Sequence, residues 1–174
     1  MTKKMEVFVL DSEKTILFLD VDGVLNCHTT TETSPSGMIG VGDVQLNFLK
    51  ELIDETNSLI VLSSTWRLEF DENLNPKTDD AKYLIEKFNE KKLKIYDMLR
   101  KEINQYDSRG TQIVDWISEH PQFKKFLILD DECFNYRELN LKYFVRTNFY
   151  GVGLNKKAIK KSIYKLKQQK EMTD

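Results

Sequence analysis

The clearest pattern along the chain is a set of short apolar runs that each end in polar or acidic residues. Runs of this length without polar alternation are typical of strands buried on both faces of a parallel sheet. They predict strands at residues 16–19, 58–62 and 126–129. A further strand is predicted at 142–147, whereas residues 93–99 fit either a strand, which we favour, or a second helix.

Residues 6–10 also form an apolar run, and the polar stretch 11–14 after it has the length of a hairpin turn. This pattern predicts a short edge strand that pairs with the central strand at 16–19. Residues 27–42 are rich in Thr, Ser, Pro and Gly and are too polar for a core element. A loop of that length in a compact domain is usually functional or mobile.

Between the apolar runs lie segments in which apolar residues recur at helical spacing. They predict helices at 43–57, 79–89, 109–120 and 155–169. We expect Asp43 to cap the first of these helices and Asn57 to close it, while His120 and Pro121 end the third.

Strands that alternate with helices predict an α/β fold: a three-layer sandwich around a mainly parallel, Rossmann-like sheet with right-handed crossovers. The length of 174 residues suits a single domain over residues 1–174. Hydrophobic residues make up 40% of the chain and charged residues 31%, a balance that excludes wholesale disorder. The net charge of −2 gives no general attraction to nucleic acid.

No apolar run approaches the roughly 20 residues that a membrane span needs, and Lys3 and Lys4 are not followed by the apolar core of a signal peptide. We therefore expect a cytoplasmic protein without a membrane partner. Cys27 and Cys133 cannot form a disulfide framework and lack the companion ligands of a zinc site, so free thiols are expected.

Polar side chains that can bind ligands or take part in a reaction follow three of the predicted strands. Asp20 and Asp22 follow the first, and the same spacing along an extended chain lets both project to one side. In open α/β sheets the ligand site lies beyond the carboxyl ends of the strands. Two carboxylates held this closely repel each other unless a cation or a proton lies between them.

The second strand ends in Ser63 and Ser64, the third ends in Asp130 and Asp131, and Arg109 opens the helix before the third. Carboxylates from separate strand ends suit Mg²⁺, which prefers hard oxygen ligands. Hydroxyls and a guanidinium suit the oxygens of a phosphoryl group. The pattern therefore predicts phosphoryl-transfer chemistry at this edge of the sheet.

The motifs themselves carry a family resemblance. DVDGVLN after an apolar strand resembles the first motif of the haloacid dehalogenase-like hydrolase superfamily, LIVLSS resembles its second, and FLILDD its fourth. They occur in the family's order and span residues 16–131. LSSTWR, RGTQIVDWI and LILDD together also resemble a compact branch of that superfamily found in phage and bacterial proteins and in RNA-repair fusions.

The resemblance implies roles for individual residues. Asp20 would be the nucleophile that forms an aspartyl phosphate, and Asp22 the acid and base that protonates the leaving oxygen and later activates water. Mg²⁺ would be held by Asp20, by the backbone carbonyl of Asp22 and by Asp130, with Asp131 as a ligand or as the partner of a ligand.

The remaining site residues would bind phosphate. Ser63 would hold the transferring phosphoryl group, with Ser64 as the alternative. The family usually has Lys in its third motif, whereas this chain offers Arg109, for which a role in holding phosphate is expected. Arg67 either contacts substrate or faces solvent. His28 either touches substrate or is an ordinary loop residue.

We expect from these features a Mg²⁺-dependent phosphatase with a small or absent cap domain and room for a small insert within 68–108. The favoured substrate is a nucleotide or a nucleic-acid terminal phosphate. The alternatives are a small-metabolite phosphatase and a non-catalytic module that binds phosphate or nucleic acid. Trp66 and Trp116 are expected in the core. The last helix is rich in lysine, which indicates a packed helix with a solvated face or a contact to a nucleic-acid backbone.

Overall fold

A computed structural model of the chain describes residues 14–99, 108–133 and 141–169. Its centre is a sheet of five parallel strands in the order β3-β2-β1-β4-β5. The strands are β1 (Thr15–Leu19), β2 (Ser58–Leu62), β3 (Ile95–Met98), β4 (Lys125–Asp130) and β5 (Phe144–Arg146). The parallel α/β sheet predicted from the apolar runs is confirmed.

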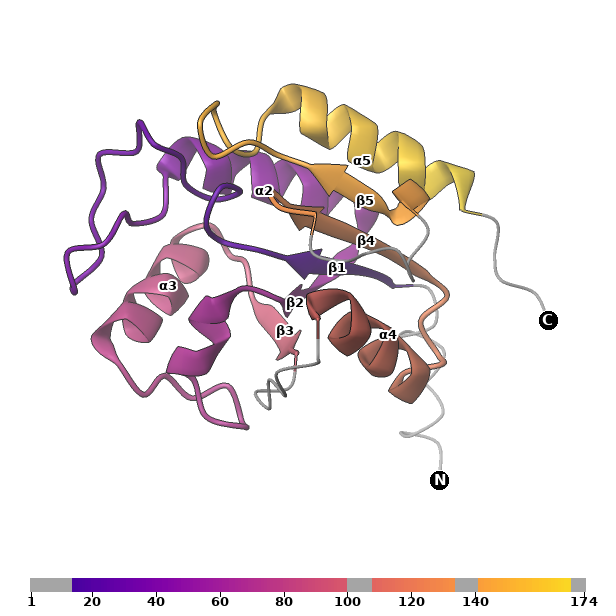
Figure 1. Cartoon of the computed structure of the whole chain (residues 1–174), viewed down its shortest axis with the longest axis horizontal. Coiled ribbons are helices and arrows are strands. Elements are labelled where there is room, and N and C mark those ends of the chain that lie inside the picture. The colour runs from indigo at the N-terminus through magenta and orange to yellow at the C-terminus, as the bar shows by residue number, and fades with distance from the viewer. Residues whose placement is uncertain (1–13, 100–107, 134–140, 170–174) are drawn as a thin grey trace.

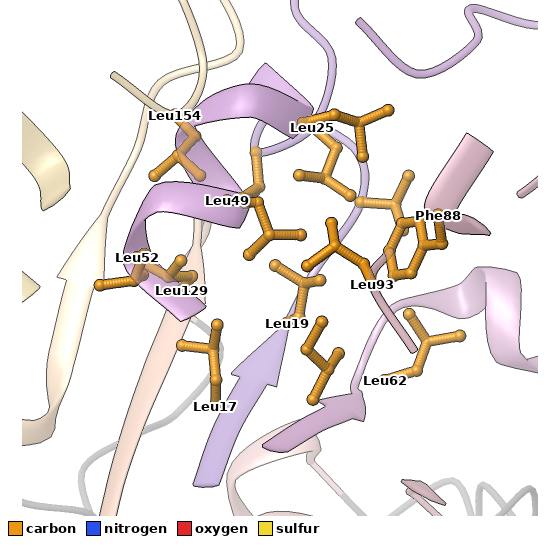
Figure 2. Packing of buried hydrophobic residues seen from close by; sticks show 14 of the residues in the cluster. Leu17, Leu19, Leu25, Leu49, Leu52, Leu62, Phe88, Leu93, Leu129 and Leu154 are labelled. Atoms are coloured by element: carbon orange, nitrogen blue, oxygen red, sulfur yellow. The ribbon is translucent and has the colours of Figure 1, made fainter. Parts of the chain in front are cut away.

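Helices cover both faces of the sheet and make it the middle of three layers (Figure 1). They are α2 (Asp43–Thr56), α3 (Asp79–Glu90), α4 (Arg109–Glu119) and α5 (Lys156–Gln168). Alternation along the central strand β1 divides its side chains between two cores. Leu17 and Leu19 pack with residues of α2, α3 and α5 (Figure 2), whereas Ile16 and Phe18 pack on the opposite face with residues of α4.

Local sequence explains how most of these elements begin and end. Asn57 adopts a left-handed conformation with φ of 52° and closes α2 as expected. The predicted N-cap of that helix is wrong by one residue, because Gly42 occupies the cap and Asp43 lies in the first turn. There its charge still suits the positive end of the helix dipole.

Two strands that were uncertain from sequence have clear outcomes. Residues 93–99 contain the strand β3, which pairs with β2, so the helical alternative is wrong. The last strand begins later than predicted, because Leu141–Tyr143 form a short 3₁₀ helix before β5. The edge strand predicted at 6–10 lies outside the described residues.

The described part of the segment 68–108 is built into the main body of the domain. Phe70 bridges to Pro76, and Leu84 and Phe88 of α3 join the core beside β1. Residues 100–107 lie outside the described residues, so the small insert expected within 68–108 stays a prediction. No helix in the described ranges is both long and apolar enough to span a membrane.

Candidate active site

The register of the sheet brings side chains from three strand ends into one row. Leu19 of β1 pairs with Leu62 of β2 and with Leu129 of β4. The residues that come directly after these three leucines therefore lie side by side, with Asp20 in the middle, Ser63 on one side and Asp130 on the other. Backbone hydrogen bonds continue the ladder, from Ser63 N to Leu19 O (2.9 Å) and from Asp20 N to Leu129 O (3.0 Å). The Asp20 carboxylate points toward the start of α4, because it pairs with Arg109, the first residue of that helix.

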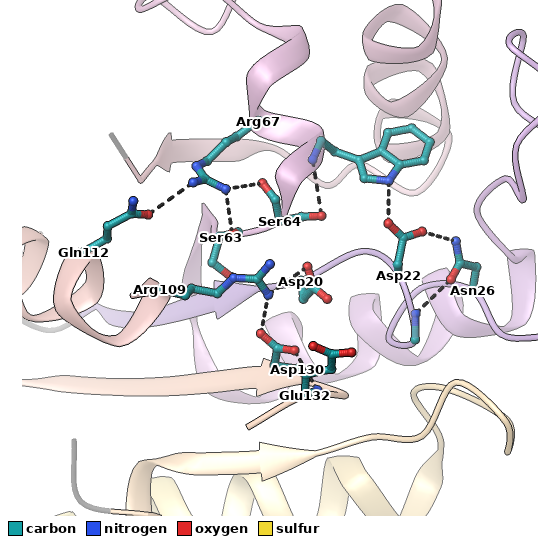
Figure 3. Close-up of polar contacts among 12 residues, drawn as sticks. Asp20, Asp22, Asn26, Ser63, Ser64, Arg67, Arg109, Gln112, Asp130 and Glu132 are labelled. Carbon is teal, nitrogen blue, oxygen red and sulfur yellow. Dashed lines mark hydrogen bonds and ion pairs between the residues drawn. The ribbon is translucent and has the colours of Figure 1, made fainter. Parts of the chain in front are cut away.

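Arg109 closes this row from α4. Ser108 caps the helix by accepting a hydrogen bond from Thr111 N, so that Arg109 is the first helical residue. Its guanidinium Nη1 lies 2.5 Å from Asp130 Oδ2 and 3.2 Å from Asp20 Oδ1 (Figure 3). One cation therefore bridges the two central carboxylates in a largely buried setting.

Asp20, Asp130 and Asp131 form a group of carboxylates whose oxygens lie within 4.8 Å of one another. Burial and the neighbouring Asp130 raise the pKa of Asp20 to about 7, although Arg109 and the Ser64 hydroxyl act in the opposite direction. Burial and Asp130 also raise the pKa of Asp131. Two buried carboxylates and one half-buried carboxylate that converge in this way offer only hard oxygen donors, and such a set fits Mg²⁺.

The carboxylate of Asp22 lies apart from that group and is held by two donors. Oδ1 accepts a hydrogen bond from Asn26 Nδ2 (2.8 Å), and Oδ2 accepts one from Trp66 Nε1 (3.1 Å). Asn26 is itself oriented by Gly23 N, which donates to Asn26 Oδ1 (2.9 Å). Asp22 is exposed. An exposed carboxylate with both oxygens hydrogen-bonded suits proton transfer to and from groups that arrive from solvent.

Sequence reasoning missed the parts that Asn26 and Trp66 play here. Trp66 is buried, as expected, but its indole also donates to a site carboxylate. The signal available in the sequence was positional: Asn26 ends the first motif, and Trp66 lies three residues after Ser63.

Gly23 of the first motif lies in close contact with the side chain of Asp131 in the fourth motif. Its φ is +73°, and a Cβ built there would lie 2.2 Å from Cγ of Asp131. Only glycine tolerates both the left-handed backbone and a carboxylate packed against its α-carbon. The glycine of the first motif therefore makes room for a carboxylate of the fourth.

The two serines after β2 have different surroundings. Ser64 caps the short 3₁₀ helix η1 (Thr65–Glu69) by accepting a hydrogen bond from Trp66 N, and its hydroxyl also interacts with Asp20. The Ser63 hydroxyl is buried and finds no partner within the part of the chain that the structure describes. A buried hydroxyl without a partner is a candidate for binding a ligand.

Arg67 lies behind the two serines. Only 2% of it is exposed, so the solvent-facing alternative is wrong. Its guanidinium donates to Ser63 O (3.2 Å), Ser64 O (2.9 Å) and Gln112 Oε1 (3.2 Å). Burial and the charge of Arg109 lower the pKa of Arg67 to about 10. Arg67 thus fixes the backbone that carries the serines, and its contact with substrate stays a prediction.

The sheet edge also carries a cleft of about 310 Å³ between the loop after β1 and the starts of α2 and α5. None of the predicted site residues lines it; Thr29, Thr30, Gln45 and Val152 are among those that do. The predicted site residues therefore lie outside this cleft. His28, just past the first motif, is exposed and is held by the Phe149 carbonyl, which accepts from its backbone N (3.0 Å).

The lysine-rich helix α5 packs Ile159 and Leu166 into the core and exposes most of its lysines, which agrees with a packed helix that has a solvated face. Lys156 at its start pairs with Glu51. Contact of this helix with nucleic acid stays a prediction. Cys27 is buried and Cys133 exposed, and both are free thiols as expected.

Comparison with known proteins agrees with this geometry. The family model described as "HAD domain in Swiss Army Knife RNA repair proteins" matches residues 16–159, a range that contains every predicted site residue. No curated protein and no solved structure matches the chain. HAD domains, the haloacid dehalogenase-like domains, are a phosphohydrolase family, as the motifs implied. The chain belongs to the family of HAD domains found in Swiss Army Knife RNA repair proteins.

Proposed function

We propose that this protein is a Mg²⁺-dependent phosphomonoester hydrolase that acts through an aspartyl phosphate on a nucleotide or on the terminal phosphate of a nucleic acid. The observation that carries this proposal is the row at the sheet edge. Asp20 stands between Ser63, whose hydroxyl has no partner among the described residues, and the carboxylate of Asp130, and the Arg109 guanidinium pairs with both carboxylates.

Asp20 is the nucleophile in this mechanism. An Asp20 oxygen attacks phosphorus and displaces the leaving oxygen, which takes a proton from Asp22. In the second half, Asp22 takes a proton from water, the resulting hydroxide attacks the phosphorus of the aspartyl phosphate, and Asp20 is released with inorganic phosphate. The hydrogen bonds from Asn26 and Trp66 hold the Asp22 carboxylate in place for both transfers.

The phosphoryl oxygens need donors while this transfer occurs. Ser63 offers a buried hydroxyl, and Arg109 offers a guanidinium next to the attacking carboxylate. Arg67 adds a second buried positive charge, and the mutual repulsion of the two guanidiniums favours an anion near them. Mg²⁺ held by Asp20, Asp130, Asp131 and the backbone carbonyl of Asp22 would neutralise charge on the nucleophile and the phosphoryl group.

The nucleic-acid substrate class is supported by the description of the matched family, which names RNA repair proteins. The small-metabolite alternative keeps the same chemistry with a smaller leaving group. A non-catalytic binding module is disfavoured, because every position that the reaction needs is filled and Asp22 is oriented by two donors.

Hydrolysis of an aryl phosphate with and without Mg²⁺ tests the mechanism. We expect Asp20→Asn to lower turnover by at least about a thousandfold. Asp54→Asn, which changes an exposed aspartate on α2, is the matched control and should leave turnover unchanged. Full turnover in Asp20→Asn, or turnover that is indifferent to the metal, would contradict the proposal.

A second variant tests the covalent step. With an activated aryl phosphate, whose leaving group departs without a proton, Asp22→Asn slows mainly the hydrolysis of the aspartyl phosphate, because no base then activates water. Phosphorylated Asp20 should then accumulate and be visible by mass spectrometry. A panel of mononucleotides, 3′- and 5′-phosphorylated oligonucleotides and sugar phosphates then compares the substrate classes.

A further inference from the structure

The loop between β5 and α5 runs along the candidate active site. Thr147 N donates to Asp130 O (2.9 Å) at its start, and Leu154 N donates to Val24 O (2.8 Å) at its end. In the middle, Phe149 O accepts from His28 N (3.0 Å), so the loop lies against the chain that follows the first motif. Figure 1 shows this loop beside the loop that leaves β1.

Tyr150 stands at the most exposed point of this loop. Tyr150 is 82% exposed. Its backbone is nevertheless fixed by hydrogen bonds from Tyr150 N to Asn148 Oδ1 (3.0 Å) and from Gly151 N to Asn148 O (3.1 Å). Phe149 packs against it edge-on, with ring centroids 5.3 Å apart. A single exposed aromatic ring is common on protein surfaces, so what distinguishes Tyr150 is its anchored backbone and the second ring beside it.

His28 extends the aromatic surface toward the first motif. Its ring lies 6.3 Å from the ring of Tyr150, at 42° to it. Both its backbone N and its ring Nδ1 lie within hydrogen-bonding distance of Phe149 O, at 3.0 and 3.2 Å, which fixes the ring orientation. The two rings thus form one platform from two segments that are distant in sequence.

The loop that carries Tyr150 is joined to the fourth motif. Consecutive Cα atoms are about 3.8 Å apart, so the Cα of Tyr150 is no more than about 11 Å from that of Thr147, whose N–H donates to the backbone carbonyl of Asp130. Tyr150 therefore lies only three residues along the chain from the end of the strand ladder that carries a site carboxylate. Arg146, exposed at the end of β5, donates from Nε to Asp131 O (2.8 Å), so its positive charge lies next to the fourth motif.

We infer that Tyr150, with His28 beside it, stacks against the base of the nucleotide whose phosphate is removed. This inference rests on the proposed function and narrows its substrate to a phosphorylated nucleoside unit, either free or at the end of a single strand. Stacking on an aromatic face tolerates any base, because every base has a π-face. The platform therefore favours a base over a bare sugar phosphate without selecting a sequence.

The test compares substrates that differ only in the base. The value of kcat/KM is measured for adenosine 5′-monophosphate and for ribose 5-phosphate, in the parent, Tyr150→Ala and Tyr150→Phe. We expect Tyr150→Ala to lower kcat/KM for the nucleotide about tenfold, and by clearly less for ribose 5-phosphate, since one base-to-ring stack is lost. Tyr150→Phe keeps the ring and should retain the parent preference.

Tyr164→Ala is the matched control. Tyr164 is also exposed, at 65%, but it lies in α5 near Gln169, which bonds to Phe126 at the start of β4, away from the carboxyl edge. Its removal should leave the preference for the nucleotide unchanged. Equal losses on both substrates in Tyr150→Ala, or the same change in Tyr164→Ala, would overturn the inference.

Binding separates this inference from the proposed function. In an Asp20→Asn background, equilibrium binding of adenosine 5′-monophosphate and of a 5′-phosphorylated oligoadenylate is measured with and without Tyr150→Ala. About tenfold weaker binding of either ligand supports the platform even if no phosphatase activity is found, and the tighter ligand identifies the source of the base. Unchanged binding of both ligands overturns the platform, whether or not the protein hydrolyses an aryl phosphate.

Discussion

The indole of Trp66 donates a hydrogen bond from Nε1 to Oδ2 of Asp22, across 3.1 Å. These residues follow two different strands and are 44 positions apart in the chain. Asn26 holds the other oxygen, so the Asp22 carboxylate has a defined orientation, two residues after the proposed nucleophile Asp20. The buried tryptophan therefore links the serine loop to the proposed general acid.

Trp66→Phe should lower kcat most for substrates with poor leaving groups. The variant keeps the aromatic packing but loses the donor to Asp22, and a poor leaving group depends most on correctly placed proton donation. We expect a loss of roughly tenfold for an alkyl phosphate and a smaller loss for an activated aryl phosphate. Trp116→Phe is the control, because its indole bonds to Asp97 instead. A uniform loss across leaving groups would argue against this role for Trp66.

Gly23→Ala should weaken the use of Mg²⁺. The new Cβ meets Cγ of Asp131 at 2.2 Å, so this carboxylate must move away from Asp20 and Asp130. We expect the Mg²⁺ concentration for half-maximal turnover to rise roughly ten- to a hundredfold. Gly37→Ala tests backbone strain alone, since Gly37 has a φ of +85° and no atom within 4 Å of the added Cβ. A similar Mg²⁺ dependence in both variants would show that displacement of Asp131 is not the cause of the weaker use of Mg²⁺.

Asp20→Asn should stabilise the metal-free protein in a pH-dependent way. The pKa of Asp20 rises from its ordinary value of 3.8 to about 7 on folding, so its ionisation opposes folding. The resulting loss of stability is absent below 3.8, grows as the pH rises toward 7, and is constant above that range.

Thermal unfolding in the presence of a chelator measures this effect. Asparagine cannot ionise, so the variant should gain little over the parent at about pH 4 and on the order of a few kcal/mol at about pH 8. Added Mg²⁺ should stabilise the parent more than the variant. A difference in stability that stays constant between the two pH values would be inconsistent with the raised pKa of Asp20.

Arg67→Lys should destabilise the fold. Arg67 donates to the Ser63 and Ser64 carbonyls and to Gln112, and a lysine cannot reproduce this forked set of donors. We expect the free energy of unfolding to fall by about 1–3 kcal/mol in denaturant titration. Arg146→Lys, at an exposed arginine, should change it by less than about 0.5 kcal/mol. Equal effects of the two substitutions would show that the buried contacts of Arg67 contribute little.

The periodicity of apolar residues and the order of the motifs determined most of the secondary structure and the position of the candidate active site. The apolar runs predicted strands at the positions of β1, β2 and β4, and helical spacing predicted all four α-helices of the described part of the chain. Asp20 and Ser63 follow strands and Asp130 ends one, and the order of these strands in the chain placed all three residues at one edge of a parallel sheet. These features depend on local alternation and on the general rule that parallel strands share one carboxyl edge, so they can be read from residues in sequence.

Only the tertiary structure decided which contacts each side chain at that edge makes. The hydrogen-bond ladder ends β2 at Leu62, which leaves Ser63 beside Asp20 and turns Ser64 into a helix cap. Arg67 points inward to the serine carbonyls, Trp66 reaches Asp22, and Gly23 admits Asp131. These contacts join residues that are distant in sequence or lie past a strand end, where alternation no longer sets the direction of a side chain. Packing between layers sets it instead, and packing depends on all the elements at once.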